Sequence, residues 1–363
     1  MKDKLFKQVP LPRSLKIEIT TRCNLACRFC GRGIAVEQYA RDKGTDIDKN
    51  TRLIPKLASS FGKDLPFNKF VEIVESLPFL TEIDLQGVGE PLLHPDFPRL
   101  ILYLSGQGIY TTFTTNGTLL TPRLSRLIIE SGHVKQITIS IDSAIPATYA
   151  FIRRGSSLPR VLDNVRSLIR LRDQYRTSLP RVRIAVVLNK YNIKELHSLV
   201  DMASNSGVDA INISMVKNVN GQIDDWLLSP DEAKPYVYEM LSHAKAKGVA
   251  IEDEAGLTPT TLNANIPTHE VCAWPWLSAM ITVDGFVTPC GYVTQPWVFN
   301  LGRITKHLSF ADIWNGNKYA EFRKDMLTGH TYGLPCYTCK DFVRTDRRKI
   351  FYYVFGEEFD EHK

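Results

Sequence analysis

The chain has 363 residues, 44% hydrophobic and 23% charged, a composition typical of globular proteins rather than disordered ones. Its formal net charge is +6 and its basic residues are scattered. This charge is compatible with an anionic ligand, but we expect no nucleic-acid partner. The sequence has no signal-peptide pattern and no run of about 18 apolar residues, so we expect a cytoplasmic protein with no membrane partner.

Short β-branched runs alternate with longer helical patterns from residue 13 to about residue 256. Six βα units in a row predict a parallel sheet, either open and doubly wound or closed into a partial barrel. Several polar motifs follow the predicted strands, at the sheet edge where ligands bind in such folds. The strands are expected at 15–20, 82–86, 110–116, 136–142, 181–189 and 210–215. The helices are expected at 67–78, 96–107, 121–131, 158–173, 192–206 and 230–247.

Two segments interrupt this alternation. Residues 31–66 form a long polar connection, and a loop of this length is usually functional or disordered. After residue 256 the chain becomes rich in Pro and Trp. We therefore expect a core domain at 13–256 with the 31–66 insertion, a small domain at 257–342, and a helical tail at 343–363.

The seven cysteines divide into a group of three and a group of four. Cys23, Cys27 and Cys30 have the spacing C-x3-C-x2-C, which brings three thiols to one side of a turn. In a reducing cytosol, clustered cysteines are more often metal ligands than disulfides. These three thiols can hold three corners of one cluster or metal, and a zinc site that borrows a distant histidine is the alternative.

A short strand precedes this cysteine loop and a parallel α/β domain follows it, and together they resemble radical S-adenosylmethionine (radical SAM) enzymes. The resemblance implies a partial (β/α)6 TIM-like barrel. It also implies that Cys23, Cys27 and Cys30 hold a 4Fe-4S cluster, whose fourth iron binds the amino and carboxylate groups of SAM. Enzymes of this family cleave SAM reductively to a 5′-deoxyadenosyl radical, which abstracts a hydrogen atom from the substrate.

The stretch QGVGEPLLHPDF, at 86–97, follows the second predicted strand. Glycines there allow the backbone to approach a ligand, and Glu90 offers a carboxylate to an ammonium group. The stretch resembles the Gly-Gly-Glu motif of the family, with Val88 in place of the first glycine. The resemblance therefore implies that Gly89 and Glu90 contact SAM.

Further SAM contacts are expected at the ends of later strands. The resemblance implies a role near the cluster and SAM for Asn116, and a ribose or methionyl contact for Ser140. Arg153 or Arg154 could bind the SAM carboxylate, because a guanidinium presents a fork of donors. A solvated helix face is the alternative for either arginine. Asn189 is expected to contact the ribose.

The second cysteine group consists of two pairs. Cys272 and Cys290 lie on either side of VDG, a predicted hairpin turn, and Cys336 and Cys339 form a later C-x2-C pair. A zinc site with four cysteines is the alternative. The spacing resembles the C-terminal SPASM and twitch modules, and is closest to the twitch-type aminocyclitol dehydrogenase of butirosin biosynthesis. The resemblance implies that the four thiols hold an auxiliary 4Fe-4S cluster.

Three functions are considered. A closed site with four thiolates leaves no iron for substrate, which favours electron transfer and a net oxidation of a small polyol, sugar or aminocyclitol. The second hypothesis is modification of a ribosomal peptide by oxidation, crosslinking or epimerisation, although an epimerase would need a spare cysteine. The third is a non-catalytic iron–sulfur or zinc scaffold. For the enzyme hypotheses, the electron donor is expected to be a flavodoxin or ferredoxin.

Overall fold

The computed structural model describes residues 6–49, 52, 54, 56, 62–217, 223–257, 270–330, 336 and 344–346. By packing, the chain divides into two compact units. The first unit contains residues 1–20, 63–87 and 265–363, and the second contains residues 21–62 and 88–264. Of the helices described, none has both the length and the apolar character needed to cross a membrane.

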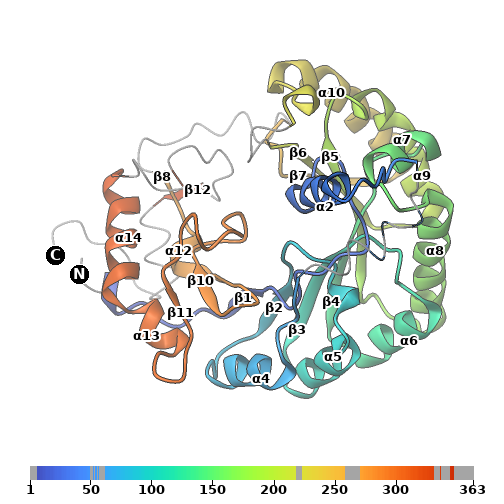
Figure 1. Ribbon diagram of the computed structural model, residues 1–363. Helices are drawn as coiled ribbons and strands as arrows, with labels where there is room; N and C mark the ends of the chain where they lie inside the picture. The colour runs from blue at the N-terminus through green and yellow to red at the C-terminus, as the bar shows by residue number, and fades with distance from the viewer. Residues whose placement is uncertain are drawn as a thin grey trace. The chain divides into compact units, whose positions relative to one another are not determined.

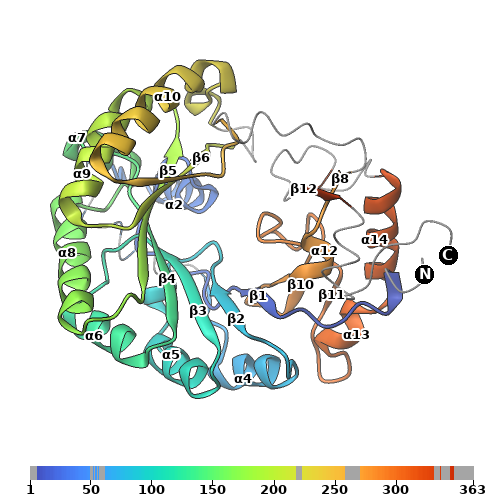
Figure 2. The same cartoon turned by 180° about the vertical axis from the view of Figure 1, so that it is seen from behind.

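The second unit is built on five consecutive parallel strands, with neighbours in chain order paired. Helices line the outer side of these strands in both views (Figures 1 and 2). The strands are β3 (Tyr110–Thr115), β4 (Val134–Ser140), β5 (Arg181–Leu188), β6 (Ala210–Met215) and β7 (Ala250–Asp253). The main helices are α5 (Phe97–Gly106), α6 (Pro122–Ser131), α8 (Leu158–Gln174), α9 (Leu196–Ser206) and α10 (Pro230–Lys247).

Local sequence signals explain these elements. In β5, every second side chain is buried, which is the period of a strand. Helix α10 begins with a capping box, in which Ser229 and Glu232 each accept a hydrogen bond from the other's backbone N–H, and it ends at Gly248 in the left-handed conformation. Helix α6 likewise begins with a Thr121 cap.

The first unit contains two strands from the N-terminal part of the chain and a C-terminal group of short elements. Strand β1 (Ser14–Ile17) pairs in parallel with β2 (Glu82–Leu85) and β9 (Met280–Ile281), and β9 pairs antiparallel with β10 (Phe286–Thr288). The remaining elements are α4 (Phe67–Glu75), β8 (Glu270–Cys272), α12 (Trp274–Leu277), β11 (Gly302–Arg303), α13 (Phe310–Trp314), α14 (Asn317–Thr328) and β12 (Arg344–Asp346) (Figure 2).

Every predicted strand and helix is present, and 210–215 and 230–247 have the predicted bounds. The helix expected at 192–206 begins as the 3-10 helix η3 (Ile193–Glu195). The 3-10 helices η2 (Pro91–Leu93) and η4 (Asp224–Trp226), the helix α7 (Pro146–Ile152) and the strand β7 were not predicted.

The 31–66 connection also differs from the expected loop, because it contains the helix α2 (Gly31–Asp42). Only Gly33, Val36 and Ala40 of this helix are buried, so its sequence carries a weak helical pattern. Val36 and Ala40 form a small apolar core with Ala26, Ile47 and Ile54. Tertiary packing therefore stabilises a helix that local sequence does not predict.

The expected helical tail is wrong at the three tail residues that the structure describes. Arg344–Asp346 forms β12, which pairs antiparallel with β8 and places Arg344 opposite Cys272. A strand forms there because the backbone of β8 supplies hydrogen-bond partners. The other residues of 343–363 lie outside the described part of the chain. The predicted hairpin turn at VDG is confirmed, with Gly285 at φ +80° between β9 and β10.

Candidate cofactor site

The loop that carries the first three cysteines is held by backbone hydrogen bonds. The N–H groups of Ala26 and Arg28 donate to the carbonyls of Arg154 and Ile152, at 3.0 and 3.1 Å. Gly33 lies so close to this loop that a Cβ there would be 2.1 Å from the carbonyl oxygen of Cys27. The loop therefore has a fixed conformation that excludes a side chain at position 33. Its three thiols, of Cys23, Cys27 and Cys30, form no disulfide.

The buried environment of these thiols suits a group that contains metal cations. Burial raises the pKa of the Cys23 thiol to about 12 and that of Cys27 to about 11, whereas metals bind thiolates. An iron–sulfur core supplies the positive charge that a buried thiolate needs. Cys30 is the N-cap residue of α2, and the positive end of a helix dipole favours negative charge. The donor set of this loop therefore fits a cluster.

Glu90 lies beside the loop and is 3% exposed. Its backbone N–H donates to the carbonyl of Arg22 at 2.7 Å, directly before Cys23. Oε1 accepts from the Thr115 hydroxyl at 2.6 Å and Leu92 N–H at 3.2 Å, and Oε2 accepts from the Asn116 N–H at 2.7 Å. A carboxylate accepts about four hydrogen bonds, so one position on Oε2 remains for a ligand. Burial raises the pKa of Glu90 to about 7.

Asn116 connects Glu90 with the cysteine loop. Besides its backbone bond to Glu90, its Nδ2 donates to Asn24 Oδ1 at 2.9 Å. Its Oδ1 accepts from the N–H and hydroxyl groups of Thr118 at 2.9 and 2.6 Å. Most hydrogen-bonding positions of the Asn116 side chain are therefore occupied, and its Nδ2 helps to position Asn24, the residue that follows Cys23.

The structure distinguishes the two arginines that the sequence left as alternatives. Arg153 points at the cysteine loop: its Nη1 lies 3.9 Å from the Cys27 sulfur and its guanidinium 5.3 Å from the Phe29 ring centroid. Its Nε donates to Asp142 Oδ2 at 2.5 Å. Asp142 is fully buried, and its Oδ1 accepts from the Val187 N–H at 2.8 Å. Asp142 thus orients Arg153, a role that the sequence analysis missed.

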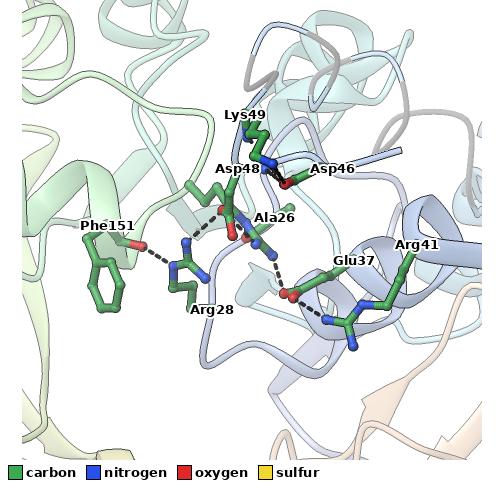
Figure 3. Close-up of polar contacts among 9 residues, drawn as sticks. Ala26, Arg28, Glu37, Arg41, Asp46, Asp48, Lys49 and Phe151 are labelled. Carbon is green, nitrogen blue, oxygen red and sulfur yellow. Dashed lines mark hydrogen bonds and ion pairs between the residues drawn. The ribbon is translucent and has the colours of Figure 1, made fainter. Parts of the chain in front are cut away.

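Arg154 is 2% exposed and contacts the 31–66 insertion instead. Its Nε donates to the Ala26 carbonyl at 3.0 Å, and its other nitrogens contact Asp48 at 3.0 Å and Glu37 at 2.7 Å. Asp48 also forms an ion pair with Arg28 at 2.6 Å (Figure 3). Arg28 lies between Cys27 and Cys30 in the sequence. Two acids of the 31–66 insertion therefore hold the cysteine loop through two arginines.

The other predicted SAM contacts have different surroundings. Gly89 is partly exposed next to Glu90. Ser140 ends β4 and is 9% exposed, beside Ala185 of β5. Asn189 is fully buried, and its amide bonds to the Val187 carbonyl and the Tyr191 N–H, both at 2.9 Å. Asn189 therefore stabilises its own turn, and its contact with a ribose stays a prediction.

A cavity of about 700 Å³ adjoins the loop at Asn24. Its lining includes Asn24, which follows Cys23, and three cationic side chains, those of Arg52, Lys56 and Arg160. Its described lining has no acidic residue, so the cavity favours an anionic partner.

The second cysteine group belongs to the first unit. Cys272 ends β8, and Cys290 follows β10. Cys336 is partly buried, and neither it nor the other two forms a disulfide. Cys339 lies outside the described residues. Within the described ranges, no three His, Cys, Asp or Glu side chains are grouped closely enough to hold a single metal ion.

Comparisons with known proteins match both parts of the chain. The model of the radical SAM superfamily matches residues 17–203, and that of the iron–sulfur cluster-binding SPASM domain matches residues 272–340. A tungsten-containing aldehyde ferredoxin oxidoreductase cofactor-modifying protein of Pyrococcus furiosus is 27% identical, over 91% of this chain and 89% of the relative. The mycofactocin maturase MftC of Mycobacterium tuberculosis is 23% identical, over 88% of this chain and 74% of its own. The crystal structure of Streptococcus suis SuiB bound to S-adenosylmethionine has a TM-score of 0.64 at 16% identity, over 86% of this chain and 68% of SuiB.

Proposed function

This chain belongs to the radical SAM superfamily, and from that premise we propose that it oxidises a small polar molecule, such as a polyol, sugar or aminocyclitol, at a carbinol carbon. The predicted fold class, a partial barrel of the radical SAM type with a C-terminal SPASM domain, is confirmed. The predicted cofactors, 4Fe-4S clusters and SAM, are confirmed as those of the matched domains. Which residues hold them is part of the proposal.

The convergence of the cysteine loop, Glu90 and Arg153 supports the SAM site. We assign the SAM-binding cluster to Cys23, Cys27 and Cys30. The remaining acceptor position of Glu90 suits an N–H of the SAM amino group, because a hydrogen bond to a buried, charged carboxylate is strong. Arg153, oriented by Asp142, carries the positive charge that suits the SAM carboxylate. Gly89, Ser140 and Asn189 stay as proposed neighbours of SAM.

We assign the auxiliary cluster to Cys272, Cys290, Cys336 and Cys339. When bound, the cofactors supply the radical that takes a hydrogen atom from the substrate and an acceptor for one electron. In the balanced reaction, a carbinol loses one hydrogen atom from carbon, one proton from oxygen and one electron, and it becomes a ketone. Four thiolate ligands favour the electron-accepting role, because they leave no iron for the substrate.

A small substrate is favoured by the relative from Pyrococcus furiosus, whose name describes the modification of a cofactor. Peptide modification is the second candidate, and the similarity to a mycofactocin maturase supports it. A non-catalytic scaffold is the third, and the buried, hydrogen-bonded Glu90 beside the loop argues against it.

An acidic flavodoxin or ferredoxin is the proposed electron donor. The cavity with Arg52, Lys56 and Arg160 lies next to Asn24, and its charge is complementary to an acidic protein. Arg160→Glu should therefore slow reduction by flavodoxin and leave reduction by dithionite unchanged. If flavodoxin reduces Arg160→Glu as fast as it reduces the wild type, the docking surface lies elsewhere.

The test of the proposed function uses anaerobically reconstituted protein with dithionite and SAM. Formation of 5′-deoxyadenosine, and its loss in Cys27→Ala, would separate an enzyme from a scaffold. Myo-inositol and scyllo-inositol, deuterated at their carbinol carbons, are then supplied as probes. We expect deuterium in 5′-deoxyadenosine and a ketone product. Deuterium transfer from a precursor peptide, with none from either polyol, would overturn the small-molecule proposal.

A further inference from the structure

Helix α14 packs against β8, the strand that ends at Cys272. Tyr319 and Arg323 lie one helical turn apart on α14, and both are fully buried. The Arg323 guanidinium lies 4.2 Å from the centroid of the Tyr319 ring and 4.4 Å from that of Trp314. The helix thus buries a phenol and a cation, stacked on each other, behind the strand that delivers an auxiliary cysteine.

Two polar atoms of this pair have no hydrogen-bond partner among the described residues. They are Tyr319 Oη and Arg323 Nη2. The other Arg323 nitrogens are used: Nε donates to the Pro275 carbonyl at 2.9 Å, and Nη1 donates to the Trp314 carbonyl at 2.7 Å. A buried donor without an acceptor costs about 1–3 kcal/mol, and one explanation for such a group in a native protein is an ion or a redox cofactor beside it.

The charge around this pair points to an anionic acceptor. No described carboxylate forms a salt bridge with Arg323, and an uncompensated buried cation is unfavourable. Burial, together with negative charge at Cys290 and Cys272, raises the pKa of Tyr319, while the Arg323 guanidinium opposes this shift. A phenol keeps its proton at neutral pH, so the Tyr319 hydroxyl can act as a donor. A cluster bound by four thiolates is net negative, because the thiolates outweigh the positive charge of its core.

We propose that Tyr319 Oη donates a hydrogen bond to a sulfur of the auxiliary cluster, and that the guanidinium of Arg323 partly neutralises the charge of that cluster. This inference rests on the proposed ligation by Cys272 and Cys290. Hydrogen bonds to cluster sulfurs and nearby positive charge stabilise the reduced, more negative state. The pair raises the reduction potential of the auxiliary cluster, and so favours transfer of the substrate electron to it.

The experiment removes the donor and measures the potential of the auxiliary cluster alone. A Cys23→Ala/Cys27→Ala/Cys30→Ala background leaves one cluster, which is titrated with EPR detection. Tyr319→Phe retains the ring over Arg323 and removes a single oxygen. We expect the reduction equilibrium to become about tenfold less favourable, which is a shift of 59 mV to more negative potential for a one-electron couple. In D2O, the protein with Tyr319 should give a hyperfine (ENDOR) signal from an exchangeable deuteron near the cluster. Tyr319→Phe should lack this signal.

Tyr149→Phe is the matched control, because Tyr149 is equally buried, belongs to the second unit and has Ser156 as its hydroxyl partner at 2.9 Å. It should leave the potential unchanged. If the triple-alanine background holds no cluster, the proposed ligation fails. If the cluster is present in Tyr319→Phe with the same potential and deuteron signal, the role of Tyr319 is overturned.

A second variant applies if Tyr319→Phe does not assemble a cluster. Incorporation of 3-fluorotyrosine at position 319 retains the ring and hydroxyl, and makes the phenol a more acidic and stronger donor. We expect a shift to more positive potential, and an unchanged potential overturns the proposal.

Discussion

The two cysteine groups of this chain differ in how their thiols are delivered. Cys23, Cys27 and Cys30 come from one loop, whose backbone and neighbouring side chains are held by residues 152–154 and the 31–66 insertion. Cys272 ends the short strand β8, and Cys290 follows the short strand β10. A single loop can preform three ligand positions and leave a fourth open, whereas four thiols from three separate segments close their site on all sides.

The two cysteine groups also differ in whether the polar side chains beside them already have partners. Around the first group, cations and acids are already paired, as in Arg153 with Asp142 and Arg154 with Glu37 and Asp48. Beside the second group, Tyr319 and Arg323 retain donors without partners among the described residues. The first site therefore resembles one prepared for an exchangeable, charged ligand, and the second one prepared for a permanently bound anion.

The largest expected effect comes from removing thiols at one site or the other. Cys23→Ala/Cys27→Ala/Cys30→Ala should abolish SAM cleavage and remove about half of the iron, because we propose one cluster of the same size at each site. Cys336→Ala/Cys339→Ala should also lose about half of the iron but still form 5′-deoxyadenosine, with little oxidised product. Iron analysis and product chromatography measure both quantities.

Loss of the second cluster can also unfold the surrounding domain, so circular dichroism of the Cys336→Ala/Cys339→Ala variant is the necessary control. A folded variant that no longer cleaves SAM would show that the two sites do not have separate roles.

The next effect concerns the acid beside the first group. Glu90→Gln keeps the shape of the side chain but removes its charge, so the hydrogen bond that we propose from the SAM amino group to Glu90 becomes a neutral one. We expect SAM affinity to fall by about 1–3 kcal/mol, or roughly 5- to 150-fold. Equilibrium binding measures the loss, with iron content as the control. Unchanged affinity at normal iron content would exclude Glu90 from the SAM site.

The same residue predicts a pH dependence. In the free protein, burial raises the pKa of Glu90 to about 7. A hydrogen bond from the amino group of SAM favours the Glu90 carboxylate and lowers this pKa, so below pH 7 binding must release a proton. Affinity should therefore rise with pH toward about 7, and rise further toward about 8, because the amine of SAM, with a pKa of about 7.7–8.0, must lose its proton to bind iron. Calorimetry in buffers of different ionisation enthalpy measures the release. Glu90→Gln should lose the rise in affinity near pH 7 and keep the rise at about 7.7–8.0.

The smallest effect tests how the insertion holds the first cysteine loop. Asp48→Asn weakens the contacts with Arg28 and Arg154. Because the Asp48 side chain is 45% exposed, solvent screens these pairs, and we expect a loss of about 1 kcal/mol. Iron release to a chelator should become about fivefold faster. Asp46→Asn is the matched control, since the contacts of Asp46 within the described residues are with its neighbours Asp48 and Lys49 (Figure 3). Equal rates in both variants would contradict the role of Asp48.

The difference between the two sites also limits what the sequence could predict. The first group has a local signature, and its strand context could be read because β-branched runs carry a period of two. Glu90 could be found for the same reason, since it follows a predicted strand. Asp142 was visible in ISIDS, but its pairing with Arg153 depends on how the β4 and α7 segments meet, which no local pattern specifies.

Long-range packing accounts for what was missed. Helix α2 buries only a narrow stripe, and Ala26, Ile47 and Ile54 complete its core, so tertiary contacts outweigh a weak local pattern. Tyr319 and Arg323 look like ordinary residues of an amphipathic helix in the sequence. Only the fold shows that both are buried without partners for Oη and Nη2 among the described residues. Strand β12 was missed for a related reason, because its partner is β8, far away in the chain.

The central claim is that one site binds SAM and the other does not. The most direct test is the EPR spectrum of the reduced protein before and after SAM is added. We predict that SAM changes the signal that is absent from Cys23→Ala/Cys27→Ala/Cys30→Ala, and leaves the signal that survives in that variant unchanged. A SAM-dependent change in the surviving signal would contradict the account.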